Sequence, residues 1–410
     1  MANQPKRLIV CLDGTWNSPD NGHATNVVKI MRAIAPVDER GVPQIAFYDA
    51  GVGADGGRID RVVDGVTGRG LEQNVRDGYR LLAHNWLPGD EIYVFGFSRG
   101  AFTARSLCGF IDLFGLLPKR DMHRLGDAWA LYQQPERQRD AAACGRVRAL
   151  ARPVRIKCLG VWDTVGALGV PGQTLQWANR KHRFHDAELS EIVECALHAL
   201  AIDEKRGPFG PVLWQKKCGE DLPKVVEQVW FPGVHSDVGG GRSDPSLSDL
   251  ALTWMIRRVQ AHSDLAIDED YMNEELHPDP LGETRDSRSP LYAVSKVLPF
   301  QRLIGQNAAR GSVLQRLVTL LRRAEMRINR PHEGCEFVNE MIHWSALARY
   351  GQMAREDGEL RLYAPANLKA AIGRLPVADE RRRGPAPAPA PALAPIPGCD
   401  ARAGAALEQV

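Results

Sequence analysis

The chain has 410 residues, of which 44% are hydrophobic and 25% are charged, and its formal net charge is +2. These values are typical of a soluble globular protein. The near-zero charge excludes a protein that binds nucleic acid or an anionic surface through net charge alone. The length suits one large α/β domain with insertions, or two modest domains.

The amino-terminal residues and the cysteines indicate where the protein is made. Residues 1–17 contain no apolar stretch long enough for a signal peptide, and no segment approaches the roughly 18 apolar residues of a membrane span. The eight cysteines are scattered without a CxxC pair or a Cys/His ligand spacing, which is typical of buried reduced thiols. We expect a soluble cytoplasmic protein, exported, if at all, by a route that needs no cleaved signal.

In chain order, short apolar runs alternate with longer segments of helical spacing. The short runs, which are typical of strands, are RLIVCLDG (7–14), QIAFYDAG (44–51), EIYVFGFS (91–98), VRIKCLGVWD (154–163) and VEQVWFPGVHSD (226–237). Helical spacing marks residues 74–87 and 185–202. Continuous rather than alternating hydrophobicity indicates strands buried on both faces, and strands separated by helices predict a parallel sheet. The expected fold is therefore α/β, with a mostly parallel sheet and helices on both faces.

Polar or reactive residues follow four of the predicted strands. They are Asp13-Gly14-Thr15, Ser98-Arg99-Gly100, Asp163-Thr164 and His235-Ser236-Asp237. In open parallel sheets, ligands bind beyond the carboxyl ends of the strands. We therefore expect these four strand ends to meet at one edge of the sheet and to form the functional site there.

The composition changes near the carboxyl end. A charge run and a Pro-Ala repeat fill the sequence from about residue 377 onward. Such a repeat favours extended polyproline II and cannot build a core. We therefore expect residues 1–376 to form one domain with helical insertions, and residues 377–410 to form a disordered tail.

Residues 96–100, Gly-Phe-Ser-Arg-Gly, fit the G-x-S-x-G pattern of a nucleophile elbow. A serine at a tight strand-to-helix turn lies in strained backbone, and side chains two residues before and after it would collide with neighbouring elements. The amide that follows the serine can donate to an oxyanion. Because a predicted strand precedes the pattern and a predicted helix follows it, we expect Ser98 to be a nucleophile.

A serine hydroxyl needs a base to accept its proton and a carboxylate to orient that base. In α/β-hydrolases the acid and then the histidine follow the serine along the chain. Asp163, at the end of a predicted strand, is the candidate acid. His235, just past a later strand, is the candidate base.

Alternatives to these two residues remain open. His343 also lies downstream of the elbow and competes with His235 for the role of base. His198 lies in a helical pattern and is interpreted as a packing residue. Asp237 could orient the imidazole in place of Asp163, whose carboxylate would then only cap a turn.

The loop after the first predicted strand is the candidate for a second oxyanion donor. We expect the amides of Gly14 and Thr15 to act together with the amide of Arg99, because glycine lets the backbone approach a ligand closely. Asp13 could instead have a structural role, in which it accepts hydrogen bonds within this loop.

Six motifs, taken in order, resemble a known family. They are LDGTWN (12–17), YDAGVG (48–53), GFSRGAFTAR (96–105), GVWDTVGALG (160–169), HALAIDEKR (198–206) and WFPGVHSDVGGG (230–241). They look like the α/β-hydrolase domains long catalogued as uncharacterised, a family that includes phospholipase effectors of bacterial type VI secretion systems. The resemblance runs from about residue 7 to residue 370. It implies an α/β-hydrolase-like fold and hydrolysis of phospholipid esters, with Ser98, Asp163 and His235 at the family's nucleophile, acid and base.

Two weaker patterns accompany these motifs. Residues 51–56, GVGADG, satisfy G-x-G-x-x-G, but further glycines break the helix that a dinucleotide site needs, so we interpret them as a loop that gates the active site. Residues 312–330 have the pattern of a basic amphipathic helix. We interpret this helix as packing its apolar stripe against the protein, with contact to anionic lipid as the alternative.

The sequence therefore predicts a serine esterase or lipase that needs no cofactor and acts on phospholipids or other lipid esters. The alternatives are a non-catalytic interaction module on a hydrolase scaffold and a metal-dependent hydrolase with ligands from Asp13 and residues 235–244. Expected partners are the lipid or ester substrate, a membrane surface in transient contact, and a secretion-apparatus or immunity protein. Nucleic acid is not an expected partner.

Overall fold

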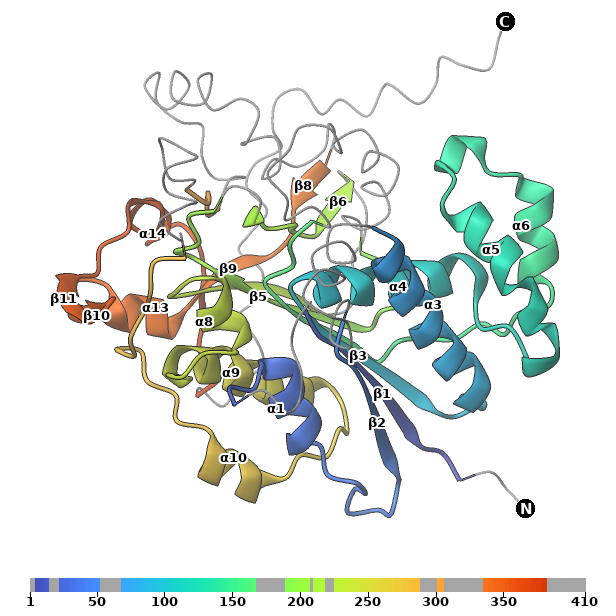
Figure 1. The fold of residues 1–410 in the computed structure, drawn as a ribbon, viewed down its shortest axis with the longest axis horizontal. Coiled ribbons are helices and arrows are strands. Elements are labelled where there is room, and N and C mark those ends of the chain that lie inside the picture. The colour runs from blue at the N-terminus through green and yellow to red at the C-terminus, as the bar shows by residue number, and fades with distance from the viewer. Residues whose placement is uncertain are drawn as a thin grey trace, which may run out of the picture.

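The computed structural model describes residues 4–14, 22–51, 68–166, 189–206, 209–217, 225–287, 301–305 and 335–381. The described residues form a central sheet of eight strands in the order β12-β9-β7-β5-β4-β3-β1-β2 (Figure 1). Every neighbouring pair in this sheet is parallel, which confirms the expected α/β fold. The strands are β1 (Arg7–Leu12), β2 (Gln44–Asp49), β3 (Glu91–Phe97), β4 (Cys158–Trp162), β5 (Cys195–Ala201), β7 (Val225–Phe231), β9 (Glu340–His343) and β12 (Val377–Ala378).

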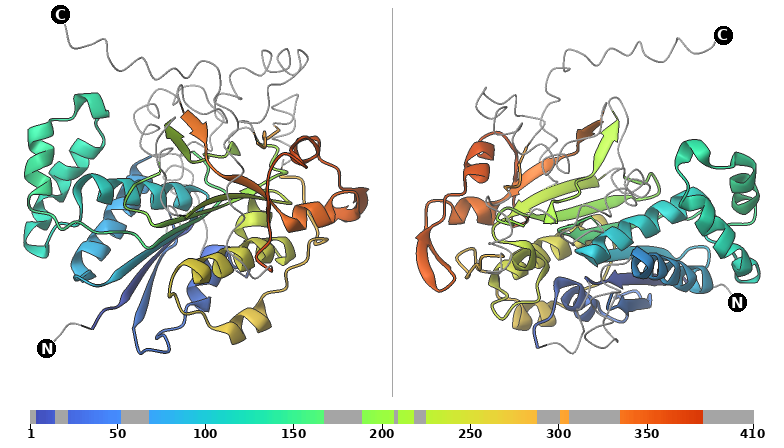
Figure 2. Two further views of the ribbon diagram at one scale, coloured as in Figure 1. Left: turned by 180° about the vertical axis from the view of Figure 1, so that it is seen from behind. Right: turned by 45° about the horizontal axis from the view of Figure 1, so that its top comes forward.

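Helices cover both faces of the sheet (Figures 1 and 2). One face carries α3 (Gly68–Asn85), α4 (Arg99–Phe114), α5 (Leu125–Tyr132) and α6 (Ala141–Arg148), and the other carries α1 (Asn26–Ala33), α9 (Ser246–His262) and α10 (Glu269–Glu275). Shorter helices are η1 (Lys119–Arg124), η2 (Glu136–Gln138), α8 (His235–Gly239), α13 (Trp344–Arg349) and α14 (Ala366–Ala371). In the described part of the chain, no helix has both the length and the apolarity needed to cross a bilayer.

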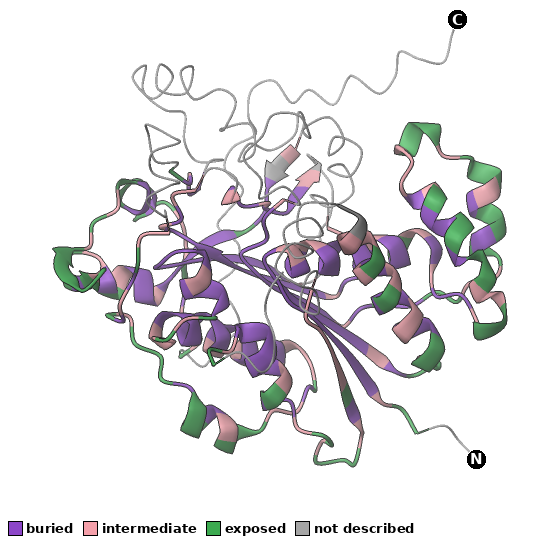
Figure 3. Ribbon diagram, viewed as in Figure 1, coloured by how far each residue is buried: buried purple, intermediate pink, exposed green. Residues whose placement is uncertain are grey.

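Two small antiparallel sheets lie outside the main sheet. One pairs β6 (Gln215–Lys217) with β8 (Cys335–Phe337), and the other pairs β10 (Met353–Glu356) with β11 (Glu359–Leu362). The β10–β11 hairpin lies at the margin of the molecule, and most of its residues are exposed (Figure 3). These additions extend the domain without interrupting the order of the parallel strands.

The inner strands of the main sheet are largely apolar because their side chains pack on both faces. In β1, Leu8, Val10 and Leu12 belong to a core cluster with residues of α3 and α4. Ile9 and Cys11 belong to a second cluster with residues of α1 and α9. Successive side chains of a strand point to opposite faces of its sheet. A strand between two layers of helices therefore has no polar face, which explains the continuous apolar runs of the sequence (Figure 3).

One predicted helix is wrong. Helical spacing predicts a helix over residues 185–202, but residues 195–201 form β5, between β4 and β7. All seven side chains of β5 are buried. A short strand that is buried on both faces has no polar side, so its pattern cannot be told from that of a buried helix by periodicity alone. Residues 185–188 lie outside the described residues.

The folded part of the chain extends past the expected boundary at residue 376. Val377 and Ala378 form β12, which pairs with β9 at one edge of the sheet. Glu380 accepts hydrogen bonds from His343 at 2.9 Å and from Trp344 at 3.3 Å. Residues 377–381 therefore belong to the sheet and its immediate packing, and the remaining residues of the expected tail, 382–410, lie outside the described residues.

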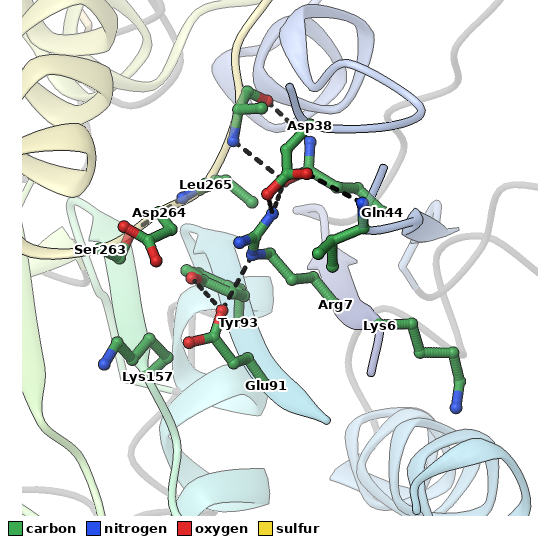
Figure 4. Close-up of polar contacts among 12 residues, drawn as sticks. Lys6, Arg7, Asp38, Gln44, Glu91, Tyr93, Lys157, Ser263, Asp264 and Leu265 are labelled. Carbon is green, nitrogen blue, oxygen red and sulfur yellow. Dashed lines mark hydrogen bonds and ion pairs between the residues drawn. The ribbon is translucent and has the colours of Figure 1, made fainter. Parts of the chain in front are cut away.

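A buried arginine joins the amino ends of the first three strands (Figure 4). Arg7 donates from Nε to Glu91 at 2.9 Å, and from Nη1 to Asp38 at 2.9 Å and to Gln44 at 3.0 Å. The hydroxyl of Tyr93 also donates to Glu91, at 3.0 Å. This network lies at the edge of the sheet opposite the predicted site, and its role is to hold β1, β2 and β3 together.

The Asp38 carboxyl makes part of the stability depend on pH. The hydrogen bond from the Val42 amide, with that from Arg7, outweighs burial and lowers the pKa of Asp38 to about 2. Because this folded pKa lies below the unfolded value of about 4, the contribution is present above that unfolded value. It is lost as the pH falls through 2.

We therefore expect Asp38→Asn to be less stable than the wild type at neutral pH, and to lose less stability between about pH 5 and about pH 2. Urea denaturation at several pH values measures both effects. The exposed Asp264 supplies the control variant Asp264→Asn. If Asp38→Asn and the wild type lose equal stability on acidification, Asp38 has no such role.

Candidate active site

The carboxyl ends of β3, β4 and β7 bring three of the predicted residues together. β3 pairs with β4 so that Phe97 lies opposite Trp162, and Ser98 and Asp163 are therefore the next residues of adjacent strands. His235 follows β7, which is separated from β4 by β5. As expected from the sequence, these strand ends meet at one edge of the sheet.

Ser98 occupies a strained turn between β3 and α4. Its backbone has φ 60° and ψ −120°, in a region that residues with a side chain rarely adopt, and α4 begins at Arg99. The Ser98 amide donates to the Trp162 carbonyl oxygen at 3.0 Å, so the turn remains attached to β4. This strand–turn–helix geometry is the context that a nucleophile elbow requires.

The two glycines of the elbow allow close packing of backbone on backbone. A Cβ at Gly96 would lie 2.6 Å from the Gly100 carbonyl oxygen. A Cβ at Gly100 would collide with the Leu12 carbonyl oxygen and lie 2.5 Å from that of Asp13. Backbone atoms cannot yield as the end of a flexible side chain can, so both positions exclude any larger residue.

His235 joins the serine to the aspartate. Its Nε2 lies 2.8 Å from Ser98 Oγ, and its Nδ1 lies 2.6 Å from Asp163 Oδ2. The imidazole ring is packed between Phe97, at a centroid distance of 4.7 Å, and Phe209, at 5.1 Å. All three polar side chains are buried, so little water competes for these hydrogen bonds. A proton on Nδ1 that is donated to Asp163 leaves Nε2 free to accept from the serine.

The segment after β5 holds the loop that carries His235. The Gly233 amide donates to Asp203 Oδ2 at 2.7 Å, and the Asp203 amide donates to the Gly233 carbonyl oxygen at 3.0 Å. The His235 amide donates to Glu204 Oε2 at 3.3 Å. This clamp fixes the position of the imidazole although His235 comes from a strand that is not adjacent to β4.

Asp163 is a fully buried carboxylate with four hydrogen bonds from three residues. Oδ1 accepts from the Ala201 amide at 2.9 Å and from Arg302 Nη1 at 2.5 Å, and Oδ2 accepts from Arg302 Nη2 at 2.9 Å in addition to His235. Burial alone would raise the pKa of Asp163, but the charge of Arg302 and the hydrogen bond from His235 hold this pKa well below its ordinary value. The carboxyl is therefore ionised at neutral and mildly acidic pH.

The two alternative histidines have other partners. His198 lies in β5, where Nε2 accepts from the Thr164 amide at 3.2 Å and Nδ1 lies 3.3 Å from Gln228 Oε1. Burial lowers its pKa to about 3, so the ring is neutral, as its interpretation as a packing residue requires. His343 is stacked on Phe231 at 4.2 Å and contacts Glu380, four strands from β3 in the sheet.

Asp237, the alternative acid, serves its own helix. Its Oδ2 accepts from the Val234 amide at 2.9 Å, and its Oδ1 pairs with Arg242 Nε at 2.8 Å. Burial raises its pKa to about 6. The carboxylate that accepts from the imidazole is that of Asp163.

The predicted oxyanion donors are only partly described. The Gly14 amide donates to Asp13 Oδ1 at 2.7 Å, and Asp13 Oδ2 accepts from Thr25 Oγ1 at 2.5 Å and from the Tyr48 hydroxyl at 2.8 Å. Asp13 thus has the structural role that the sequence allowed. Arg99 is the first residue of α4, directly after Ser98. Thr15 lies outside the described residues.

Several other sequence patterns fall partly or wholly outside the described residues. Gly51 is the one described residue of 51–56, with φ 75° and a carbonyl contact that leaves no room for a Cβ. Residues 312–330, the expected basic helix, lie outside. Within the described ranges, no three His, Cys, Asp or Glu side chains gather around a common point as metal ligands do.

Sequence reasoning missed three residues of this site. Arg302 follows a stretch without any motif and lies 139 positions after Asp163, so no local signal links the two. Phe209 packs against the imidazole and likewise belongs to no motif. Glu204 is buried and lies within HALAIDEKR, a motif to which the sequence analysis gave no role. An acid in that motif was the signal that could have pointed to it.

Comparisons with known proteins identify the family to which this chain is similar. The model of the family described as "T6SS, Phospholipase effector Tle1-like, catalytic domain" matches residues 6–258. The uncharacterized protein YEL023C of Saccharomyces cerevisiae is 29% identical over 243 residues, which cover 54% of this chain and 33% of that protein. The chain thus spans about a third of this curated relative.

Two solved structures are also similar. The first is an uncharacterized protein from Pseudomonas aeruginosa, with a TM-score of 0.44 and 20% identity, covering 67% of this chain and 49% of that one. The second is the Tle1 effector bound to the VgrG spike of the type VI secretion system, with a TM-score of 0.29 and 17% identity, covering 59% of this chain and 52% of that one.

The elbow glycines give a test of the fold around Ser98. Gly100→Ala should destabilise the protein by about 3 kcal/mol, because the new methyl group meets the carbonyl oxygens at the end of β1. Gly145→Ala in α6 is the matched control. Nothing lies within 4 Å of its Cβ position, and the change should be neutral or stabilise by up to about 1 kcal/mol. Chemical denaturation measures both, and equal stabilities of the two variants would contradict the packing described.

Proposed function

This chain belongs to the family of type VI secretion phospholipase effectors with a Tle1-like catalytic domain, and we propose that it is a serine hydrolase that cleaves ester bonds of phospholipids or related lipid esters. The observation that carries this proposal is the hydrogen-bonded chain from Ser98 through His235 to Asp163 at the carboxyl edge of the sheet. The family's description supplies the substrate class.

In the proposed reaction, Ser98 Oγ attacks the ester carbonyl carbon while His235 Nε2 accepts the hydroxyl proton. The imidazolium that forms is stabilised by Asp163, which also keeps the proton on Nδ1 before the attack. His235 then donates its proton to the leaving alcohol, and water releases the acyl group from Ser98 by the same steps. The reaction needs no cofactor, because each proton has a donor and an acceptor among these residues.

The negative charge that develops on the carbonyl oxygen needs donors close to Ser98. The amide of Arg99 is suited to this role, because it directly follows Ser98 at the start of α4, and the amino end of a helix favours negative charge. Gly14 and Thr15 are proposed as the second source of donors. The Gly14 amide would have to exchange Asp13 Oδ1 for the oxyanion.

The family also suggests where the substrate and the partners are found. We propose a lipid surface as the site of action, reached after delivery by a secretion apparatus, with an immunity protein as the natural antagonist. The hydrolase chemistry does not depend on this delivery route, and the experiments below test the chemistry.

Ser98→Ala should reduce hydrolysis of phospholipid vesicles and of simple esters by at least about a thousandfold, because it removes the attacking oxygen. Release of fatty acid measures the rate, and a fluorophosphonate probe should label the wild type but not the variant. Ser248→Ala is the control, since the hydroxyl of this buried serine donates to the carbonyl oxygen of Pro245, the residue that precedes α9.

The outcomes of that experiment separate the alternatives. A folded wild type that neither hydrolyses esters nor reacts with the probe would favour an interaction module. Activity that survives in Ser98→Ala but disappears with a chelator would favour a metal-dependent hydrolase.

Asp163→Asn should lower kcat by about a thousandfold to ten-thousandfold, because an amide at this position favours the wrong imidazole tautomer. Asp237→Asn loses its pairing with Arg242 but no contact with the imidazole, so its activity should stay within about tenfold of the wild type. Initial rates on one soluble ester compare the two variants. The reverse order of activities would transfer the orienting role to Asp237.

A further inference from the structure

Arg302 is completely buried beside the proposed acid, and its contacts are those of a clamp. Nη1 donates to Asp163 Oδ1 at 2.5 Å and to the Ala201 carbonyl oxygen at 2.8 Å. Nη2 donates to Asp163 Oδ2 at 2.9 Å and to the Phe209 carbonyl oxygen at 2.6 Å. The guanidinium therefore holds both carboxylate oxygens in one plane, as only arginine can do with two parallel hydrogen bonds.

The segment that carries Arg302 is itself held in place. Asn367, at the start of α14, donates from its side-chain Nδ2 to the Arg302 carbonyl oxygen at 3.1 Å and to the Ile202 carbonyl oxygen at 3.0 Å. Arg302 lies outside residues 6–258, which the family model matches. A part of the chain beyond the matched region thus reaches back to the proposed site.

We propose that Arg302 is a positioning residue of the hydrolase, which fixes the carboxylate that orients His235 and offsets the charge of that carboxylate beside the imidazole. This inference rests on the function proposed above. The oxygen that accepts from His235, Asp163 Oδ2, also accepts from Arg302, so loss of the guanidinium frees the carboxylate to rotate. Arg302 also holds the backbone of Phe209, whose ring packs against the imidazole.

The charges around His235 are arranged in acid–arginine pairs. The end of β4 contributes Asp163 with Arg302, the segment after β5 contributes Glu204 with Arg206 at 2.9 Å, and α8 with the residues after it contributes Asp237 with Arg242 at 2.8 Å. Further titratable groups in this region are Arg99 at the start of α4, Asp203, whose pKa is raised to about 6 by burial, and the neutral His198 beneath Asp163.

Removing one member of these pairs changes the charge that the imidazole experiences. Without Arg302, the Asp163 carboxylate is uncompensated and stabilises the imidazolium, so His235 should hold its proton to a higher pH. Because the base must be neutral to accept from Ser98, the acidic limb of the pH–rate profile should move upward by about one pH unit. Asp203 and Asp237 are present in the wild type and in every Arg302 variant, so their titration does not cause a shift of the acidic limb between variants.

The experiment compares Arg302→Gln and Arg302→Lys with the wild type on a soluble ester across pH. We expect kcat to fall about tenfold to a hundredfold in Arg302→Gln, with an upward shift of the acidic limb of the pH–rate profile. KM should stay within about threefold of the wild type, since Arg302 is fully buried. Lysine restores the positive charge but cannot bridge both carboxylate oxygens of Asp163. In Arg302→Lys, the acidic limb of the pH–rate profile should therefore return toward the wild-type position while kcat stays low.

Arg258→Gln is the matched control. Arg258 forms a largely buried two-oxygen pair with Glu227, with Nε 3.1 Å and 3.0 Å from its oxygens, between α9 and β7. Arg258→Gln should lower the stability of the protein without shifting the acidic limb of the pH–rate profile. The proposal is wrong, and Arg302 is a structural residue, if both Arg302 variants lose kcat while the acidic limb of their pH–rate profiles stays at the wild-type position. It is also wrong if both variants keep the wild-type kcat and the wild-type position of the limb. Where Arg302→Gln does not fold, a wild-type kcat in Arg302→Lys also overturns it.

Failure of the function itself is recognised independently. Titration of the His235 ring by NMR, with Ser98→Ala carrying each Arg302 substitution, reports on the imidazole without any turnover. A raised midpoint in Arg302→Gln would support the positioning role even if the wild type hydrolysed no ester. If the wild type hydrolyses esters but the midpoint of the His235 titration is the same with and without Arg302, the positioning role is refuted and the proposed hydrolase function is not.

Discussion

The proposed site depends on the parallel pairing of β3 with β4. Because Phe97 lies opposite Trp162, the chain leaves both strands at the same level, and both residues that follow, Ser98 and Asp163, have positive φ values, 60° and 39°. The two side chains thereby leave the strand direction at neighbouring points of one edge. A single imidazole then suffices to connect them. His235 reaches that place across β5 because the carboxylates of Asp203 and Glu204, which follow β5, accept hydrogen bonds from backbone amides of its loop.

Burial gives this arrangement its strength and also its main cost. A buried carboxylate is stable only with partners that offset its lost hydration, and Asp163 has a guanidinium, an imidazole and a backbone amide. In such an environment each hydrogen bond is stronger than it would be in water, and the direction of the imidazole is defined. The same acid–arginine pairing recurs around His235, so the proposed base lies in a region of dense charge but little net charge.

The sequence was sufficient for five of the eight strands, namely β1, β2, β3, β4 and β7, and for the three residues that the structure brings together. Strands buried on both faces and glycine-flanked turns leave strong local signals. The sequence was insufficient for β5, since a strand with two apolar faces has the same composition as a buried helix. Arg302 could not be found either, because its contact with Asp163 is made only by the fold. β9 and β12 were not predicted, because runs of four and two residues are too short to stand out in the sequence.

β12 forms one edge of the main sheet, where it pairs with β9. From β3 the strand order passes through β4, β5, β7 and β9 before it reaches β12, and neighbouring strands are about 4.8 Å apart. β12 is therefore separated from β3, which leads into the elbow serine, by about 24 Å. A fluorophore attached to β12 would therefore lie at the margin of the sheet, with β4, β5, β7 and β9 between it and β3, and could report on the packing of that edge without contacting the elbow serine.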